Sequence, residues 1–173
     1  LADLQSNPLL IGTAMTPGQI STIKQAIAAD PVMASASTSD DGSDLIAAMF
    51  NIVQPTYIVW KTAVEADAIM RSGMNWTRVD NLSIGKARIW EWLTKLGTIN
   101  ASKPNVRAGI DATWVGTAAD LAVRDQVYTH CKRSATRLEQ LLATGSGTDA
   151  SPSTMGYEGN IGYAEISVIR NTP

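Results

Sequence analysis

Residues 16–31 read TPGQISTIKQAIAADP, and this stretch contains every signal of a helix with defined ends. Thr16 can cap the first turn with its hydroxyl, Pro17 suits the first helical position, and Gln19 completes a capping box. Isoleucines and alanines then follow at helical spacing. The pair Asp30-Pro31 ends the pattern, because the residue before a proline is displaced from the α region.

Similar helix signals recur along the chain as far as Thr144. An Asp41-Gly42-Ser43 turn precedes a helix that ends before Pro55, and a Thr62–Glu65 capping box begins a short helix that ends at Gly73. A further helix covers 82–96 and is ended by Gly97, and the next begins at Ser102-Lys103-Pro104. Capping boxes at Thr117–Asp120 and Thr136–Glu139 begin the last two helices. The last two helices could also be one long helix with an irregularity near Ser134. Two short runs, 57–60 and 76–79, are β-prone. The pattern predicts a mainly α fold: a helical bundle-like body of about six or seven helices with short extended segments.

The chain changes character near Thr144. Residues 144–153 are small, polar and rich in glycine and serine, as flexible linkers are. The following residues, 155–169, alternate apolar side chains with glycines and favour a β-hairpin or a glycine-punctuated arm that docks elsewhere, since a lone hairpin is marginal in water. The predicted organisation is an N-terminal arm over 1–15, a helical domain over 16–143, and a flexible linker with a C-terminal docking arm over 144–173.

Composition narrows the class of protein. The 173 residues suit one domain, and 45% of them are hydrophobic. Only 17% are charged, against about 25% in typical domains, which favours a surface that is covered in an assembly. A net charge of −2 argues against a general nucleic-acid or membrane-surface binder. No run approaches a membrane span, and residues 1–14 lack the basic start of a signal peptide, so we expect a soluble protein made in a cytoplasm.

The residues that usually carry chemistry do not form a set. His130 and Cys131 are the only histidine and cysteine, and adjacent helical residues point about 100° apart, so they form no catalytic couple. Cys131 is expected to be a buried thiol. One histidine and one cysteine cannot build a zinc site, and the acidic residues 40–44 lack the closing ligand of a calcium loop. We therefore expect no catalytic, cofactor-binding or metal site.

Two other features suggest surfaces. Basic residues gather within 124–137, where they could contact phosphate or an acidic partner, or form a solvated face near a helix end. Trp90 and Trp92 lie about 200° apart on their predicted helix, so they cannot both face one core. One of them should meet another helix layer or another subunit.

Three runs of the sequence carry a family resemblance. Residues 79–92 (VDNLSIGKARIWEW), 105–110 and 132–139 resemble proteins encoded among the virion genes of tailed bacteriophages. Within that group the helical body is most similar to head-to-tail adaptor (neck or connector) proteins, small subunits that form a ring, commonly of twelve, beneath the portal. The resemblance implies a structural virion protein that is made in the host bacterial cytoplasm, assembles as a dodecameric ring, binds portal and tail proteins, and lines the channel in passing contact with packaged DNA.

These considerations identify candidate partner contacts in two places. The C-terminal arm supplies Tyr157, Ile161, Tyr163 and Ile166, and the basic set supplies Arg124, Lys132, Arg133 and Arg137. Alternative functions are another virion component (a tail terminator or capsid accessory protein), a helical nucleic-acid-binding regulator that uses residues 124–137, and an enzyme that uses His130.

Overall fold

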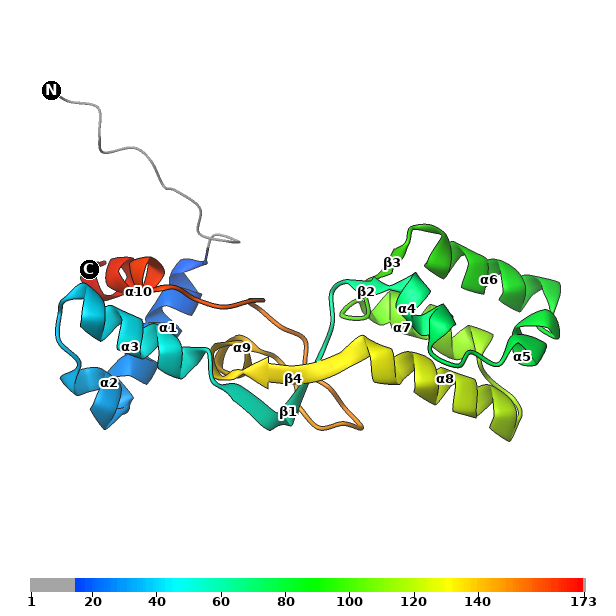
Figure 1. Cartoon of the computed structure of the whole chain (residues 1–173), viewed down its shortest axis with the longest axis horizontal. Helices are drawn as coiled ribbons and strands as arrows, with labels where there is room; N and C mark the ends of the chain where they lie inside the picture. Colours follow the sequence, from blue (N-terminus) through cyan, green and yellow to red (C-terminus); the bar gives the residue numbers. More distant parts are fainter. Residues whose placement is uncertain (1–14, 173) are drawn as a thin grey trace, which may run out of the picture. The chain divides into compact units, whose positions relative to one another are not determined.

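The computed structural model describes residues 15–172, which are mainly α-helical (Figure 1). Over this range the helices are α1 (Pro17–Ala29), α2 (Pro31–Ser35), α3 (Asp40–Phe50), α4 (Ala66–Arg71), α5 (Trp76–Asp80), α6 (Ile84–Lys95), α7 (Pro104–Thr113), α8 (Ala118–Cys131), α9 (Arg137–Leu142) and α10 (Tyr163–Asn171); the strands are β1 (Val53–Trp60), β2 (Val64–Glu65), β3 (Thr98–Ile99) and β4 (Lys132–Thr136). The predicted N-terminal arm over 1–15 lies outside the described residues, apart from Met15. None of the helices within 15–172 is long and apolar enough to cross a membrane.

The described chain forms two compact units, which corrects the prediction of one helical domain over 16–143. Unit 1 contains the described residues through Pro55, then Ala135–Thr144, and those from Met155 onward; unit 2 contains Thr56–Ser134 and Gly145–Thr154. The chain passes from one unit to the other within β1 and again within β4, which are neighbours in a two-stranded sheet. Each unit has its own hydrophobic core, and the two cores share no residue. Helical periodicity reports which residues are buried but not which core receives them.

Unit 1 is built from α1, α2, α3, α9 and α10. Its first helix begins as predicted, because the Thr16 hydroxyl accepts a hydrogen bond from Gln19 N at 3.3 Å and the Gln19 side chain accepts one from Thr16 N. The predicted turn at 41–43 is wrong, since these residues lie inside α3. A Cβ at Gly42 would fall 2.0 Å from the carbonyl oxygen of Ser37, so glycine lets the preceding loop lie directly against the helix.

The C-terminal segment completes the core of unit 1, which overturns the prediction of a hairpin or docking arm. Tyr157, Ile161 and Ile166 are buried there, and the segment ends in the helix α10, which packs against α3. Asn51 holds the approach to this helix, because its side chain donates to Ile161 O at 2.8 Å and accepts from Ile161 N at 2.9 Å. Glu165 accepts a hydrogen bond from Gly162 N at 2.9 Å at the start of α10, a helix signal that the sequence analysis did not use.

The predicted flexible linker over 144–153 is instead hydrogen-bonded along β1 in unit 2. Ile58 N donates to Gly147 O at 2.7 Å, and Trp60 N donates to Ser153 O at 3.0 Å. The Tyr57 hydroxyl lies 2.9 Å from the Ser153 hydroxyl. The β-prone run 57–60 is therefore confirmed as strand, and the glycine-rich segment is hydrogen-bonded to β1 in addition to its sheet partner β4.

Unit 2 contains α4 to α8 and the short antiparallel pair β2 and β3, in which Val64 lies opposite Ile99. The predicted starts of α7 and α8 are confirmed, and α6 lies within the predicted 82–96 range. Trp90 and Trp114 meet edge to face at the centre of the core, with ring centroids 5.2 Å apart.

Three local predictions in unit 2 are wrong. Residues 76–79 are helical, because the Asn75 side chain accepts a hydrogen bond from Arg78 N at 3.2 Å and caps α5. The predicted helix start at Thr62 is wrong, since Val64 and Glu65 pair with β3 and α4 begins only at Ala66, with Glu65 at its N-cap. The strand β4 separates α8 from α9, so these are not one long helix.

Candidate functional site

Trp60 lies among cations and a second aromatic ring in unit 2. The Arg107 guanidinium carbon is 4.9 Å from the centroid of the Trp60 ring, and Lys132 Nζ is 5.9 Å from it. The Tyr128 ring lies 5.3 Å away and its hydroxyl donates to Asp111 Oδ1 at 2.9 Å. These residues line an open cleft of about 390 Å³ together with Arg124, Asp125, Asp149 and Ala150. Burial raises the pKa of Tyr128, and its hydrogen bond to Asp111 acts in the same direction, so the phenol stays a donor.

The predicted basic set is not a single cationic patch. Arg124 lies 3.9 Å from an Asp111 oxygen, and Lys132 Nζ lies 3.3 Å from Asp149 Oδ1. Arg133 donates to Ser134 O at 3.1 Å. Arg137 belongs to unit 1, where it pairs with Asp30 at 2.8 Å. Nearby acids thus offset much of the positive potential that a phosphate group would meet.

The structure brings His130 close to Ser72, a residue that the sequence analysis did not single out. The Ser72 hydroxyl lies 2.6 Å from His130 Nε2 and donates to Ile69 O at 2.9 Å at the end of α4. The hydroxyl has one hydrogen to share between Ile69 O and His130 Nε2, and the tautomer of the imidazole decides whether Nε2 accepts or donates. The side chain of Gln126 also donates to Ser72 O, at 2.8 Å. The contact therefore joins α4 to α8 as a structural tie.

Other chemical candidates are equally limited in this part of the chain. Cys131 is buried, and burial raises the pKa of its thiol to about 11, so it is a protonated core residue at neutral pH. Within 15–172 no group of three histidine, cysteine, aspartate or glutamate side chains is arranged to hold a metal ion.

The predicted contact residues of the C-terminal arm are corrected by their burial. Tyr157, Ile161 and Ile166 lie in the core of unit 1, where no partner can touch them while the unit is folded. Tyr163 alone of the four is exposed, by about half of its surface.

An exposed apolar face on α6 is the more substantial candidate for partner binding. Ile84 is 76% exposed, Trp92 77% and Leu96 84%, and they follow one another at steps of eight and four residues. Arg88 fills the remaining four-residue step and is also exposed. Trp90, on the opposite side of the helix, is only 4% exposed, which confirms the prediction that Trp90 and Trp92 face different surroundings. We call Ile84, Arg88, Trp92 and Leu96 the α6 ridge.

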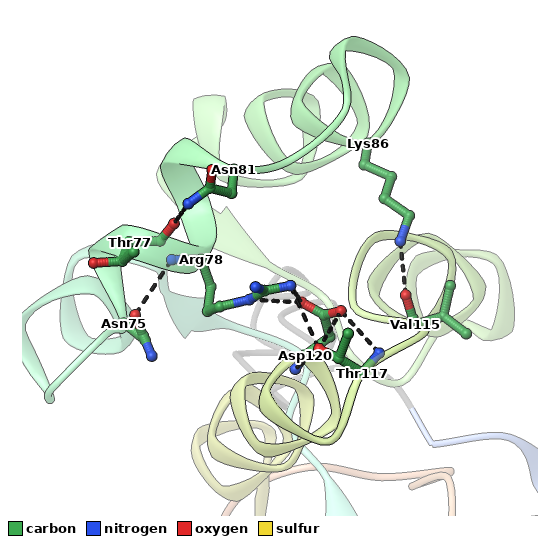
Figure 2. A network of polar contacts seen from close by, with 8 residues as sticks. All are labelled: Asn75, Thr77, Arg78, Asn81, Lys86, Val115, Thr117 and Asp120. Carbon is green, nitrogen blue, oxygen red and sulfur yellow. Dashed lines mark hydrogen bonds and ion pairs between the residues drawn. The ribbon is translucent and has the colours of Figure 1, made fainter.

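Polar contacts hold α6 and the preceding helix against the rest of unit 2 (Figure 2). Arg78 of α5 donates from Nε to Asp120 Oδ1 at 3.0 Å, and Asp120 also accepts from Thr117 N at 3.0 Å at the start of α8. Lys86 in α6 donates to Val115 O at 2.7 Å. The Arg78 hydrogen bond, assisted by those from Thr117, lowers the pKa of Asp120 to about 2, so its carboxylate is charged at neutral pH. The α6 ridge is thus presented on a helix with an anchored beginning.

The α6 ridge could be predicted from the sequence only in part. The angle between Trp90 and Trp92 showed that one indole leaves the core. It did not show that α7 packs on the Trp90 side and leaves the other side open. Comparison of the chain with models of known families, with curated proteins and with solved structures finds no match.

Proposed function

We propose that this chain is a non-catalytic structural subunit of a tailed-bacteriophage virion, a head-to-tail adaptor that forms a ring between portal and tail and lines the DNA channel. The observation that carries the proposal is the α6 ridge, with three large apolar side chains each more than three-quarters exposed. Large apolar side chains that are exposed together along one side of a helix are candidates for a protein interaction site. The low charge content and the resemblance of three sequence runs to phage virion proteins support the same function.

A helical nucleic-acid-binding regulator is less well supported. Such a protein needs cations that are free to neutralise phosphates. Arg124, Lys132 and Arg137 each lie beside an aspartate, and they are divided between the two units. Passing contact with packaged DNA in a channel requires no such affinity.

The test is the mass of the purified protein, alone and mixed with the portal protein encoded in the same genome. We expect a ring-sized assembly that binds the portal, in solution by light scattering and as rings by electron microscopy. A protein that remains monomeric and ignores the portal would contradict the proposal. Steep salt-dependent binding to DNA by the free protein would instead favour the regulator.

A further inference from the structure

The α6 ridge needs a partner surface, and its chemistry specifies one. The ridge carries a cation, Arg88, between Ile84 and the large apolar pair Trp92 and Leu96. Within the described residues no side-chain hydrogen bond or ion pair engages Arg88. A complementary surface would place acidic groups beside small and apolar ones at the same helical spacing, because residues four apart form the ridges and grooves through which helices pack.

Unit 1 has such a surface on α3. Its exposed side consists of Asp41, Asp44, Leu45 and Ala48, and the exposed Ile52 follows just beyond the helix. Along the chain this surface begins with the two acidic residues, continues with Leu45 and the small Ala48, and ends with the apolar Ile52. Over residues 15–172 no side-chain hydrogen bond or ion pair engages Asp41 or Asp44. We call these five residues the α3 strip.

We propose that the α6 ridge of one copy binds the α3 strip of the next copy. With the two helices side by side and parallel, Arg88 meets Asp41 and Asp44, Trp92 lies over Leu45 and Ala48, and Leu96 reaches Ile52. Each step along one helix is matched by a step of three or four residues along the other. The small side chain of Ala48 leaves room for the indole, which is the side chain best suited to act as the anchor of an interface.

The two surfaces are different, and this decides the kind of assembly. A contact between unlike surfaces is head-to-tail, and it generates a closed ring where the rotation between copies closes. Pairing of the α6 ridge with itself would give only a two-fold dimer. The inference rests on the proposed ring function and names the interface between neighbouring subunits.

Charge reversal on the full-length protein tests the contact. Arg88→Glu and Asp44→Arg should each weaken self-association at least about tenfold, measured by sedimentation over a concentration series. The double variant should recover most of the loss, because every interface then contains an inverted pair. Trp92→Glu should abolish assembly. Asp44 lies beyond the first turn of α3, so its reversal spares the helix start.

Matched controls separate the contact from folding and from the wider function. Arg71→Glu reverses an exposed charge on α4, and Trp76→Glu replaces an exposed indole on α5; neither should change assembly. Circular dichroism must show each variant folded. If Asp44→Arg has no effect while Arg88→Glu does, α6 binds another surface and the inference is wrong. Rings that form and bind portal despite all three variants would overturn the inference and leave the adaptor function standing; a wild-type monomer without portal binding would overturn both.

Discussion

At the scale of single residues, Asp120 shows how one carboxylate secures a helix start and a neighbouring helix together. It accepts hydrogen bonds from Arg78 of α5 and from Thr117, the residue that caps α8 (Figure 2). The Arg78 hydrogen bond, first among these contacts, lowers the pKa of Asp120 from 3.8 to about 2. A carboxylate with a lowered pKa in the folded state stabilises it fully above the unfolded pKa, and this stabilisation is lost as pH falls through the folded pKa.

Asp120→Asn should therefore lower the free energy of unfolding at neutral pH, and the gap to wild type should narrow between pH 3.8 and about 2. Urea unfolding at several pH values measures both quantities. Asp67→Asn is the matched control, because Asp67 pairs with Arg71 on the surface and such exposed pairs contribute little. A gap that stays constant down to pH 2 would show that the charge on Asp120 is not what stabilises the folded state.

Position 147 requires glycine both for its backbone conformation and for the lack of room for a side chain. Its φ is +67°, and a Cβ there would fall 2.3 Å from the Tyr57 ring. Gly147→Ala should cost about 1–2 kcal/mol for the left-handed backbone and about 1–3 kcal/mol more for the clash. Gly73→Ala isolates the first cost, since Gly73 has a φ of +87° and open space around it. Equal losses of stability in thermal unfolding of the two variants would contradict the packing of residue 147 against β1.

At the scale of elements, α10 is core rather than a free arm, and one comparison within the helix tests this. Ile166 is buried in unit 1, whereas Tyr163, in the first turn, is about half exposed. Ile166→Ala should destabilise the protein by about 2–5 kcal/mol, as large-to-small changes in cores do. Tyr163→Ala should cost well under 1 kcal/mol unless the ring is used by a partner. Similar small effects of both substitutions on the denaturation midpoint would restore the interpretation of a docking arm.

The elements that could be predicted are those whose signals are local. The capping boxes at Thr16, Thr117 and Thr136 are formed by residues three apart, so the sequence alone locates α1, α8 and α9. The segment after Thr144 was misjudged because its partners are distant in sequence. Ile58 and Asn51 supply hydrogen bonds that order this segment. The glycine-rich composition of the segment does not indicate these distant partners.

The candidate site follows the same division. The angle between Trp90 and Trp92 is a local property, and it correctly assigned one indole to the core and the other elsewhere. Of the α3 strip, only Asp41 was predicted to lie in a turn, because Asp41, Gly42 and Ser43 are typical turn residues; the residues that follow were predicted to be helical. In the structure all three residues lie inside α3, where Asp41 is exposed, Ser43 is buried, and Gly42 leaves room for the backbone of Ser37.

At the scale of the whole molecule, the sequence of unit 1 is interrupted by that of unit 2, but unit 2 contributes no residue to the described core of unit 1. Among the described residues, the eleven buried residues of its core all come from its own three segments. Where the interruption begins and ends, the chain returns to itself, since Arg137 N donates to Ile52 O at 2.8 Å. The two ends of the inserted segment are therefore close together. The entropic cost of bringing the ends of a loop together rises only slowly with its length, so a long insertion costs little more than a short one.

Unit 1 should consequently fold without unit 2. Replacing residues 56–134 with a short glycine-rich turn, and 145–154 with a Gly-Ser linker, leaves every core residue of unit 1 in place. The described residues of unit 1 number about 70, and one core of that size rarely provides more than about 3–5 kcal/mol of stability, so we expect a helical protein with a single cooperative transition at modest denaturant. Circular dichroism with urea measures it, and adding Ile166→Ala should remove the transition if the core is the one described. A chain without any cooperative transition would mean that unit 1 depends on unit 2 for its stability, and that the two cores, although separate in their residues, fold as one.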